Sequence, residues 1–399
     1  MERFFATCPR GLELILADEL RQLKAEKIHT VGGGVQFGGD FFLCYRVNLE
    51  SRIASRVLWQ VAHGDYRSED DIYRAAYAPR WTDWFDPART LRVDISATKS
   101  PLTSLNFVTL KIKDAVCDKI RRSAGRRPNV DTREPDIPIQ GHLSDREFTL
   151  YLDTTGEPLF KRGQRISTGE APLRENLAAG IIRLAGWAPG IPLLDPMCGS
   201  GTILLEAAHM TLDIAPGLGR GFAFEKLRNF DPRRWRDLLR QSRARQKPKA
   251  PLAIYGSDFS ADVLKSARAN LLAAGLEKVV SLNRADVLKI AAPAKEGIIV
   301  TNPPYGVRIG EQRALEEFYP KLGDVLKKQF TGWHVYLLSA DMRLPKLIHL
   351  AASKRTPLFN GALECRLFEY KMVEGGMRKK KGEADDSSSQ PREDAAGSA

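Results

Sequence analysis

The sequence predicts an α/β fold in which a parallel, doubly wound sheet follows smaller α+β modules. Three observations predict it. An unbroken β-branched run, 298–301, stops at an Asn-Pro-Pro-Tyr stretch, and a strand, a glycine turn and a helix follow one another over 193–209. Two further strand-like segments end in acidic residues, Asp258 and Asp286. Segments of this kind are typical of buried parallel strands whose ends meet at one edge of a sheet.

The stretch after residue 301 is the candidate catalytic loop. Two consecutive prolines stiffen it and remove two backbone donors. The Asn302 amide oxygen and the Pro303 carbonyl then remain as rigid acceptors for the two hydrogens of a planar amino group. Tyr305 would offer a stacking face for a base. For the tetrapeptide alone a plain turn is the alternative. The candidate catalytic residues are Asn302, Pro303, Pro304 and Tyr305.

The glycine turn predicts a nucleotide-side ligand site. The glycines at 199 and 201 let a ligand approach the backbone, but Leu204 stands where a dinucleotide fingerprint has its third glycine, which disfavours an NAD enzyme. Asp258 is placed to accept from a ribose diol, and Asp286 could accept from an adenine amino group. A helix N-cap is the alternative for each aspartate, because helices are expected to follow both.

Composition restricts the class of protein. The 399 residues, 43% of them hydrophobic, suffice for two or three domains. No apolar run reaches membrane-spanning length and the N-terminus lacks a signal-peptide layout, so we expect a cytoplasmic protein without a membrane partner. Five scattered cysteines predict neither a disulfide framework nor a metal site. Cys198 is interpreted as a small packing residue rather than a nucleophile.

The net charge of +12 favours anionic partners such as nucleic acid, although a solvated basic surface is the alternative. Basic residues cluster on a predicted helix over 106–123 and in a long insert, 215–251. Two interpretations of the insert are open and compatible: a substrate platform beside the site, and an amphipathic helix, 231–246, docked by Trp235 and Leu238. The candidate RNA-binding residues are Lys111, Lys113, Arg121, Arg122, Arg126, Arg127, Arg233 and Arg234.

The chain is expected to divide into a ferredoxin-like α+β module at 1–65, a second module at 66–155 and the large domain at 165–373. The large domain is expected to open with a helix that starts at Pro172. It should close with a hairpin whose Asn360-Gly361 pair predicts a type I′ turn. The tail, 374–399, is expected to be disordered.

Together these motifs resemble a known family. The segment 193–201, the two aspartates and the Asn-Pro-Pro-Tyr loop are similar to class I S-adenosylmethionine-dependent amino-methyltransferases, and 66–153 resembles a THUMP RNA-binding domain. The whole arrangement resembles the guanine-N2-methyltransferases of large-subunit (23S) ribosomal RNA. The resemblance implies a Rossmann-like class I methyltransferase domain. It also implies in-line methyl transfer from S-adenosyl-L-methionine to a flipped guanine, without a metal or covalent intermediate.

The resemblance also implies which residues bind the donor, namely Asp195, Met197, Gly199, Gly201, Thr202, Asp258, Phe259 and Asp286. The implied partner is 23S ribosomal RNA or a large-subunit assembly intermediate. Fused members of the family continue into a second methyltransferase domain that makes 7-methylguanine, so only the N2 activity is expected of this chain. A transfer RNA guanine-N2-methyltransferase and a non-catalytic ribosome-assembly factor are the alternatives.

Overall fold

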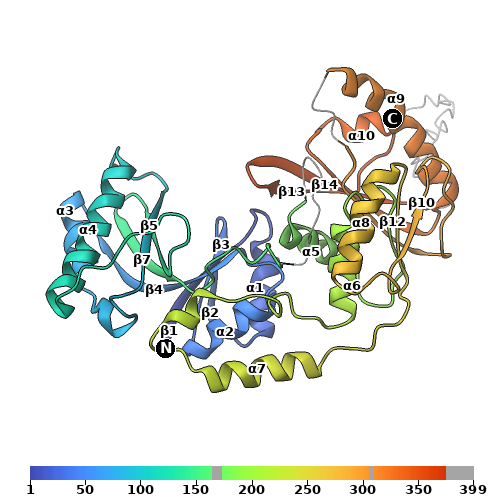
Figure 1. Cartoon of the computed structure of the whole chain (residues 1–399). Helices are drawn as coiled ribbons and strands as arrows, with labels where there is room; N and C mark the ends of the chain where they lie inside the picture. The colour runs from blue at the N-terminus through green and yellow to red at the C-terminus, as the bar shows by residue number, and fades with distance from the viewer. Residues whose placement is uncertain (164–172, 305–308, 374–399) are drawn as a thin grey trace, which may run out of the picture.

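The computed structural model describes residues 1–163, 173–304 and 309–373, without the side chains of 309–312. Two seven-stranded sheets organise these residues (Figure 1). The first sheet belongs to the N-terminal half of the chain and the second to the C-terminal half. The described residues therefore confirm the α/β class, and the expected tail at 374–399 lies outside them.

The first sheet has the strand order β2-β3-β1-β4-β7-β6-β5. Its strands are antiparallel neighbours except for the parallel pair β5 and β6. Its strands are β1 (Glu2–Thr7), β2 (Glu26–Val31), β3 (Gly34–Gly39), β4 (Arg56–Asp65), β5 (Leu91–Ala97), β6 (Ile137–Leu143) and β7 (Glu147–Asp153). Its helices are α1 (Glu13–Gln22), α2 (Phe41–Glu50), α3 (Glu69–Tyr77) and α4 (Leu105–Ala124), with a short η1 (Trp81–Asp83).

Strand β4 joins the two N-terminal modules into one body. Residues 56–59 of β4 pair with β1, and residues 58–65 pair with β7 across a bulge near Gln60. An ion pair between Arg56 and the buried carboxylate of Asp153 ties the same two strands together. The expected boundary near residue 65 therefore falls at the end of a strand that both modules share.

Helix α4 confirms the expected helix over 106–123. The Ser104 hydroxyl accepts from the Phe107 backbone N–H at its start, and Gly125, with φ of 69°, ends it in the left-handed conformation. Val108, Ile112 and Ile120 form its buried stripe against the sheet. The opposite face of α4 is thereby left on the surface of the second module.

The second sheet has the order β10-β9-β8-β11-β12-β14-β13 and is parallel from β10 to β12. Its strands are β8 (Leu193–Asp195), β9 (Ile254–Asp258), β10 (Ser281–Arg284), β11 (Gly297–Thr301), β12 (Trp333–Ser339), β13 (Lys354–Asn360) and β14 (Leu363–Lys371). Its helices are α5 (Glu175–Leu184), α6 (Thr202–Thr211), α7 (Pro232–Ala244), α8 (Ala261–Ala273), α9 (Ile309–Gln329) and α10 (Leu344–Leu347), with a short η2 (Ala223–Lys226). All residues of β11 are buried, as a central parallel strand requires.

The two ends of the second sheet differ in detail from the expectation. Helix α5 begins at Glu175 rather than Pro172, which lies outside the described residues. The hairpin β13–β14 is present, but Gly361 and Ala362 are its two central residues, because Asn360 pairs with Leu363. Gly361 has φ of 67° and neither Asn360 nor Ala362 has a positive φ, so the expected type I′ turn is wrong.

Buried polar groups join the N-terminal body to the second sheet. Arg162 donates from Nη2 to the Arg52 carbonyl and to the Glu206 carboxylate, both at 3.0 Å. Arg52 in turn donates to the carbonyls of His209 and Ile214. Because these charged groups are buried, each needs its partners, and the contact fixes the two bodies against each other.

Close helix packing completes this junction. A Cβ atom at Gly180 of α5 would lie 2.3 Å from Cδ1 of Leu12, a fully buried residue that precedes α1. Only a glycine allows this approach, since Leu12 has no solvent side into which it could turn. No helix in the described part of the chain is long and apolar enough to cross a membrane. The same residues contain no cluster that could hold a metal ion.

We expect Gly180→Val to lower the free energy of unfolding by about 2 kcal/mol, because overpacking at a filled contact forces side chains apart. Urea denaturation followed by circular dichroism would measure the change. Gly32→Ala is the matched control, because no atom lies within 4 Å of its added Cβ. Combining Gly180→Val with Leu12→Ala should recover part of the loss, and strict additivity of the two changes would contradict this packing account.

Candidate functional site

Parallel pairing brings the predicted strand ends to one edge of the second sheet. Asp195 pairs with Gly256 of β9, and Arg284 of β10 pairs with Asp258. The register of β8 and β11 puts Ile299 beside Leu194, so β11 ends beside the turn that follows Asp195. The four candidate segments thus leave neighbouring strands in the order β10, β9, β8, β11, at the edge where open α/β sheets bind ligands.

The glycine turn after β8 is held by its neighbours. The Cys198 N–H donates to the Ser257 carbonyl at 2.9 Å, and the Asn270 amide donates to the Ser200 carbonyl at 3.0 Å. Gly199 and Gly201 have φ values of 54° and 82°, which side chains rarely adopt. No atom lies within 4 Å of a Cβ built on Gly199, so its backbone faces open space.

Asp258 organises this turn. Its Oδ2 accepts from the Gly199 N–H at 3.2 Å, and its Oδ1 accepts from the Ser260 N–H at 3.0 Å. The N-cap of α8 is Ser260, whose hydroxyl accepts from Val263, so the N-cap alternative for Asp258 is wrong. The carboxylate oxygens keep further lone pairs for a ligand.

Asp195 is a buried carboxyl at the end of β8. Its Oδ1 accepts from the Met197 N–H at 3.3 Å. Burial, together with the negative charge of Asp258, raises the pKa of the Asp195 carboxyl to about 7. The site therefore holds a group that changes its charge near neutral pH, and a cationic ligand would favour the ionised form.

The remaining candidate donor residues surround the same edge. Phe259 is 73% exposed directly after Asp258, and its ring is available to a base. Asp286 is half-buried and accepts from the Leu288 N–H at 3.0 Å. Between Asp286 and β11 the chain forms no helix, so the N-cap alternative for Asp286 is wrong as well. Thr202 is the buried first residue of α6.

These residues fit an adenosyl donor. The backbone at Gly199 faces open space, so a ligand can approach it closely. The carboxylate of Asp258 offers hydrogen-bond acceptors to a ribose diol. The exposed ring of Phe259 can cover a purine, while the Asp195 carboxyl supplies negative charge for a cationic group.

The acceptor loop leaves β11 at the same edge. Asn302 is half-buried, Pro303 is buried and Pro304 is exposed, whereas Tyr305 lies outside the described residues. The Pro304 carbonyl accepts from the hydroxyl of Tyr319 at 2.9 Å. Tyr319 is a fully buried residue of α9, and burial raises the pKa of its hydroxyl well above the ordinary range. This anchor was not predicted, because nothing in the sequence relates residues fifteen positions apart across a loop.

Cys198 packs inside the glycine turn and is buried. Burial raises the pKa of its thiol well above the ordinary range, and the charges of Asp195 and Asp258 act in the same direction. A thiolate nucleophile is therefore disfavoured. The structure agrees with the interpretation of Cys198 as a packing residue.

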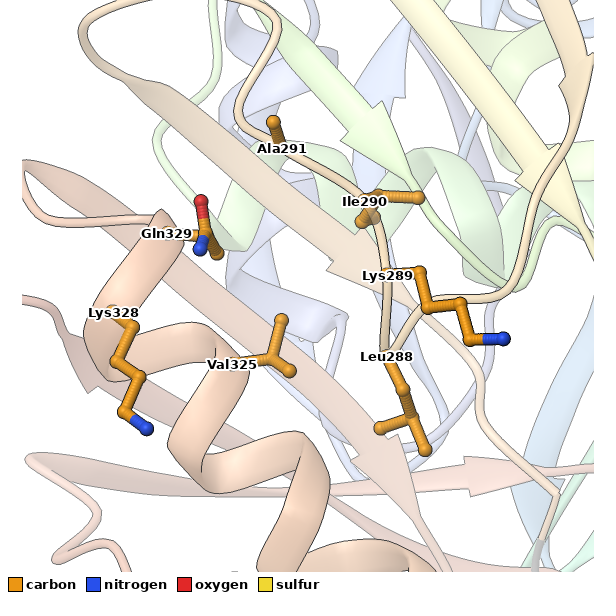
Figure 2. Close-up of a pocket in the computed structure, with 7 residues that line it drawn as sticks. All are labelled: Leu288, Lys289, Ile290, Ala291, Val325, Lys328 and Gln329. Carbon is orange, nitrogen blue, oxygen red and sulfur yellow. The ribbon is translucent and has the colours of Figure 1, made fainter.

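A hollow of about 150 Å³ lies farther along the chain from Asp286. Figure 2 shows Val325 of α9 facing the loop that follows β10, while Lys289 points away from the helix. Its lining residues are Leu288, Lys289, Ile290, Ala291, Val325, Lys328 and Gln329. None of the candidate residues at the sheet edge lines this hollow, so it is a separate feature.

The basic face of α4 carries more ion pairs than expected. Most of its candidate RNA-binding side chains contact an acidic group or a tyrosine hydroxyl, and Arg126 is exposed. The contacts are Lys111 to Asp70, Lys113 to Asp114, Arg121 to Asp118, Arg127 to both Asp114 and Asp118, and Arg122 to the Tyr77 hydroxyl. Exposed ion pairs of this kind are weak, so phosphate groups could replace the acidic partners.

Aromatic rings lie among these cations. Lys111 Nζ lies 5.9 Å from the ring centre of Tyr73 and 5.5 Å from that of Phe107. Phe107 is 47% exposed. The basic residues of this surface were predicted from the sequence, whereas the exposure of Phe107 was not, because an aromatic residue in an amphipathic helix is usually on the buried side.

Arg233 and Arg234 occupy the first turn of α7. This helix packs against α2 of the N-terminal body, and Trp235 and Leu238 are buried. The expected amphipathic helix is thus confirmed. In Figure 1, α7 runs along the lower edge of the molecule, whereas α9, which follows the acceptor loop, lies at the upper edge. The interpretation of the insert as a substrate platform stays a prediction.

Comparison with known families agrees with this architecture. Residues 162–369 match the RMKL-like methyltransferase domain, 66–153 match the THUMP domain and 3–58 match the RlmL ferredoxin-like domain. A solved structure of a candidate methyltransferase in complex with S-adenosyl-L-homocysteine (SAH) superposes with a TM-score of 0.85 at 29% identity. The match covers 94% of this chain and 98% of that one.

Two relatives cover most of the chain. A candidate RNA methyltransferase from Synechocystis sp. is 40% identical over 92% of this chain and 96% of its own length. The ribosomal RNA large subunit methyltransferase K/L of Aeromonas hydrophila is 39% identical over 97% of this chain, which spans only 56% of that protein. With its THUMP and ferredoxin-like domains, the chain belongs to the RMKL-like methyltransferase family, whose cofactor is S-adenosyl-L-methionine.

Proposed function

We propose that this protein methylates the N2 amine of a guanine in large-subunit ribosomal RNA. The observation that carries the proposal is the placement of the Asn302 loop beside the glycine turn, at one edge of the parallel sheet. The relative in Aeromonas hydrophila is named as a large-subunit ribosomal RNA methyltransferase, which supports the substrate class.

The donor side would be formed by the glycine turn and three strand ends. Bound S-adenosyl-L-methionine supplies an electrophilic methyl group. Asp258 would bind the ribose diol, Asp286 the adenine amino group and Phe259 the adenine face. Asp195, Met197, Gly199, Gly201 and Thr202 would form the remaining cradle. The hydrogen bond from the Gly199 N–H to Asp258 holds the glycine turn beside the carboxylate that would bind the ribose.

The acceptor side would hold the guanine amine. The lone pair of an aryl amine is delocalised into the ring, so the amine is a weak nucleophile. The Asn302 amide oxygen and the Pro303 carbonyl would accept its two hydrogens, favour a tetrahedral nitrogen and stabilise its developing positive charge. The new C–N bond forms as the methyl group leaves the donor, and the extra proton then passes from the nitrogen to water.

The reaction and its substrate can be tested together. Labelled S-adenosyl-L-methionine would be incubated with the protein and total RNA from cells that lack it, followed by nucleoside mass spectrometry and site mapping. N2-methylguanine at one large-subunit site is the expected result. Label in transfer RNA would instead indicate a transfer RNA guanine-N2-methyltransferase. Donor binding without transfer to ribosomal RNA or assembly intermediates would favour a non-catalytic assembly factor.

We expect Asn302→Ala to lower the rate of methyl transfer at least about a hundredfold, the usual effect of removing one positioned polar group at a reacting centre. The donor affinity should change little, because Asn302 is assigned to the acceptor. Single-turnover transfer and donor titration would measure the two effects. A normal transfer rate in Asn302→Ala would refute the catalytic assignment.

Tyr319→Phe should slow methyl transfer about five- to tenfold, because the loss of one buried hydrogen bond frees the Pro304 carbonyl. Tyr370→Phe is the matched control. Tyr370 is equally buried in the same core, and its hydroxyl has no hydrogen-bond partner among the described residues. Equal losses in both variants would show that packing, rather than the bond to Pro304, determines the rate.

Donor affinity should rise with pH between about 5.5 and 8. The Asp195 carboxyl, with its pKa raised to about 7, is protonated at the lower end and ionised at the upper end, and the ionised form attracts a cationic donor. For the same reason its contribution to the stability of the donor-free protein is present below about pH 4 and is lost as the pH rises through 7. Isothermal titration calorimetry across this range would measure the affinity. In Asp195→Asn the rise should disappear, and its persistence would assign the titration to another group.

A further inference from the structure

Helix α7 presents arginines on the side opposite its packing face. At 3.6 residues per turn, Arg233, Arg236, Arg240 and Arg243 fall within an arc of about 80°, on a line about 15 Å long. All four are exposed. The buried residues Trp235, Leu238 and Ser242 lie on the other side. We call these four arginines the α7 arginine row.

The base of the helix is held firmly. Trp235 packs edge-on against Tyr45 of α2, with ring centres 6.1 Å apart, and against Phe224, at 5.1 Å. The Asp231 side chain caps the first turn and accepts from the Arg233 and Arg234 N–H groups. The aromatic residues of the insert therefore pack inside the protein. The exposed arginines of the α7 arginine row remain available to bind a ligand.

Two other arginines of the insert have structural roles. The guanidinium carbon of Arg234 lies 4.0 Å from the ring centre of Phe42. Arg245 pairs with Glu50 at 3.2 Å and with Asp213 at 3.4 Å. Both residues help to dock the helix, and the RNA contact predicted for the exposed Arg234 stays a prediction.

Three of the four arginines in the α7 arginine row lack an ion-pair partner among the described residues. Arg240 pairs with Asp237 on the same helix at 3.0 Å. Among the described residues, no carboxylate forms an ion pair with Arg233, Arg236 or Arg243. Every basic residue of α7 is arginine rather than lysine, although either would make the surface soluble. Arginine has the planar fork of donors that suits phosphate oxygens.

We propose that the α7 arginine row binds the phosphate backbone of RNA at a place remote from the methylated base. This inference rests on the proposed RNA substrate. Helix α7 and helix α9, which follows the acceptor loop in the chain, lie at opposite edges of the molecule, so the row would contact a different part of the RNA from the target guanine (Figure 1). The row therefore contributes to RNA affinity and to KM, and not to the rate of the bound complex.

The test compares full-length variants in binding to an in vitro transcript of 23S ribosomal RNA at several salt concentrations. In R233A/R236A/R243A the slope of log affinity against log salt should fall by about 2 to 3, because each lost phosphate contact removes about 0.7 to 0.9. The matched control, K265A/R268A/K321A, removes the same charge from exposed sites on α8 and α9 and should keep the slope. R233K/R236K/R243K should keep most of the slope, because the charges remain.

Donor affinity, measured by titration, reports whether each variant is folded. An unchanged slope in the alanine variant, an equal fall in the control, or no binding of the transcript by the unaltered protein would overturn the proposal. Methyl transfer separates this inference from the proposed function. If the slope falls in the alanine variant but the unaltered protein transfers no methyl group, RNA binding by the α7 arginine row is supported and the proposed methylation is rejected. If the unaltered protein transfers methyl groups but the slope is unchanged in the alanine variant, the methylation is supported and the role of the α7 arginine row is rejected. For the alanine variant we expect a raised KM for RNA and an unchanged kcat.

Discussion

Parallel pairing of β10, β9, β8 and β11 is the constraint on which the rest of the site depends. Parallel strands all end at the same edge, so Asp195 and Asn302, far apart in the sequence, lie at the ends of two strands that pair directly, β8 and β11. The hydrogen bond from Gly199 to Asp258 then fixes the glycine turn against the neighbouring strand. The hydroxyl of Tyr319 holds the Pro304 carbonyl in a similar way, so polar contacts position both the proposed donor side and the proposed acceptor side.

The junction between the two sheets has a different character. Its charged groups, Arg52, Arg162 and Glu206, are buried, and their partners come from both bodies. Burial lowers the pKa of Arg52 to about 10 and that of His209 to about 3, so His209 is neutral at physiological pH. Burial of this kind contributes little net stability, but a displaced partner would leave an uncompensated charge. The junction therefore favours one relative placement of the N-terminal body and the second sheet.

Much of this arrangement could be predicted from the sequence. The run at 298–301 and the glycine turn indicated buried strands by pattern alone, and the helix of α4 followed from its periodicity. The turn at Gly361 and the partner of Tyr319 could not be predicted, because a turn type depends on two dihedral angles and a long-range bond on the packed fold. The insert was ambiguous for a related reason. Basic and aromatic residues alternate in its sequence, and only the packing of Trp235 on Tyr45 separates the docking face from the exposed one.

The shared strand β4 has a consequence for how this architecture can be divided. Because β4 pairs with β1 on one side and with β7 on the other, neither N-terminal module has a complete sheet of its own. A fragment that begins after residue 65 would expose the full length of β7 as an unpaired edge, a surface that invites aggregation. The two modules therefore form one continuous sheet, although their sequences match two separate family models.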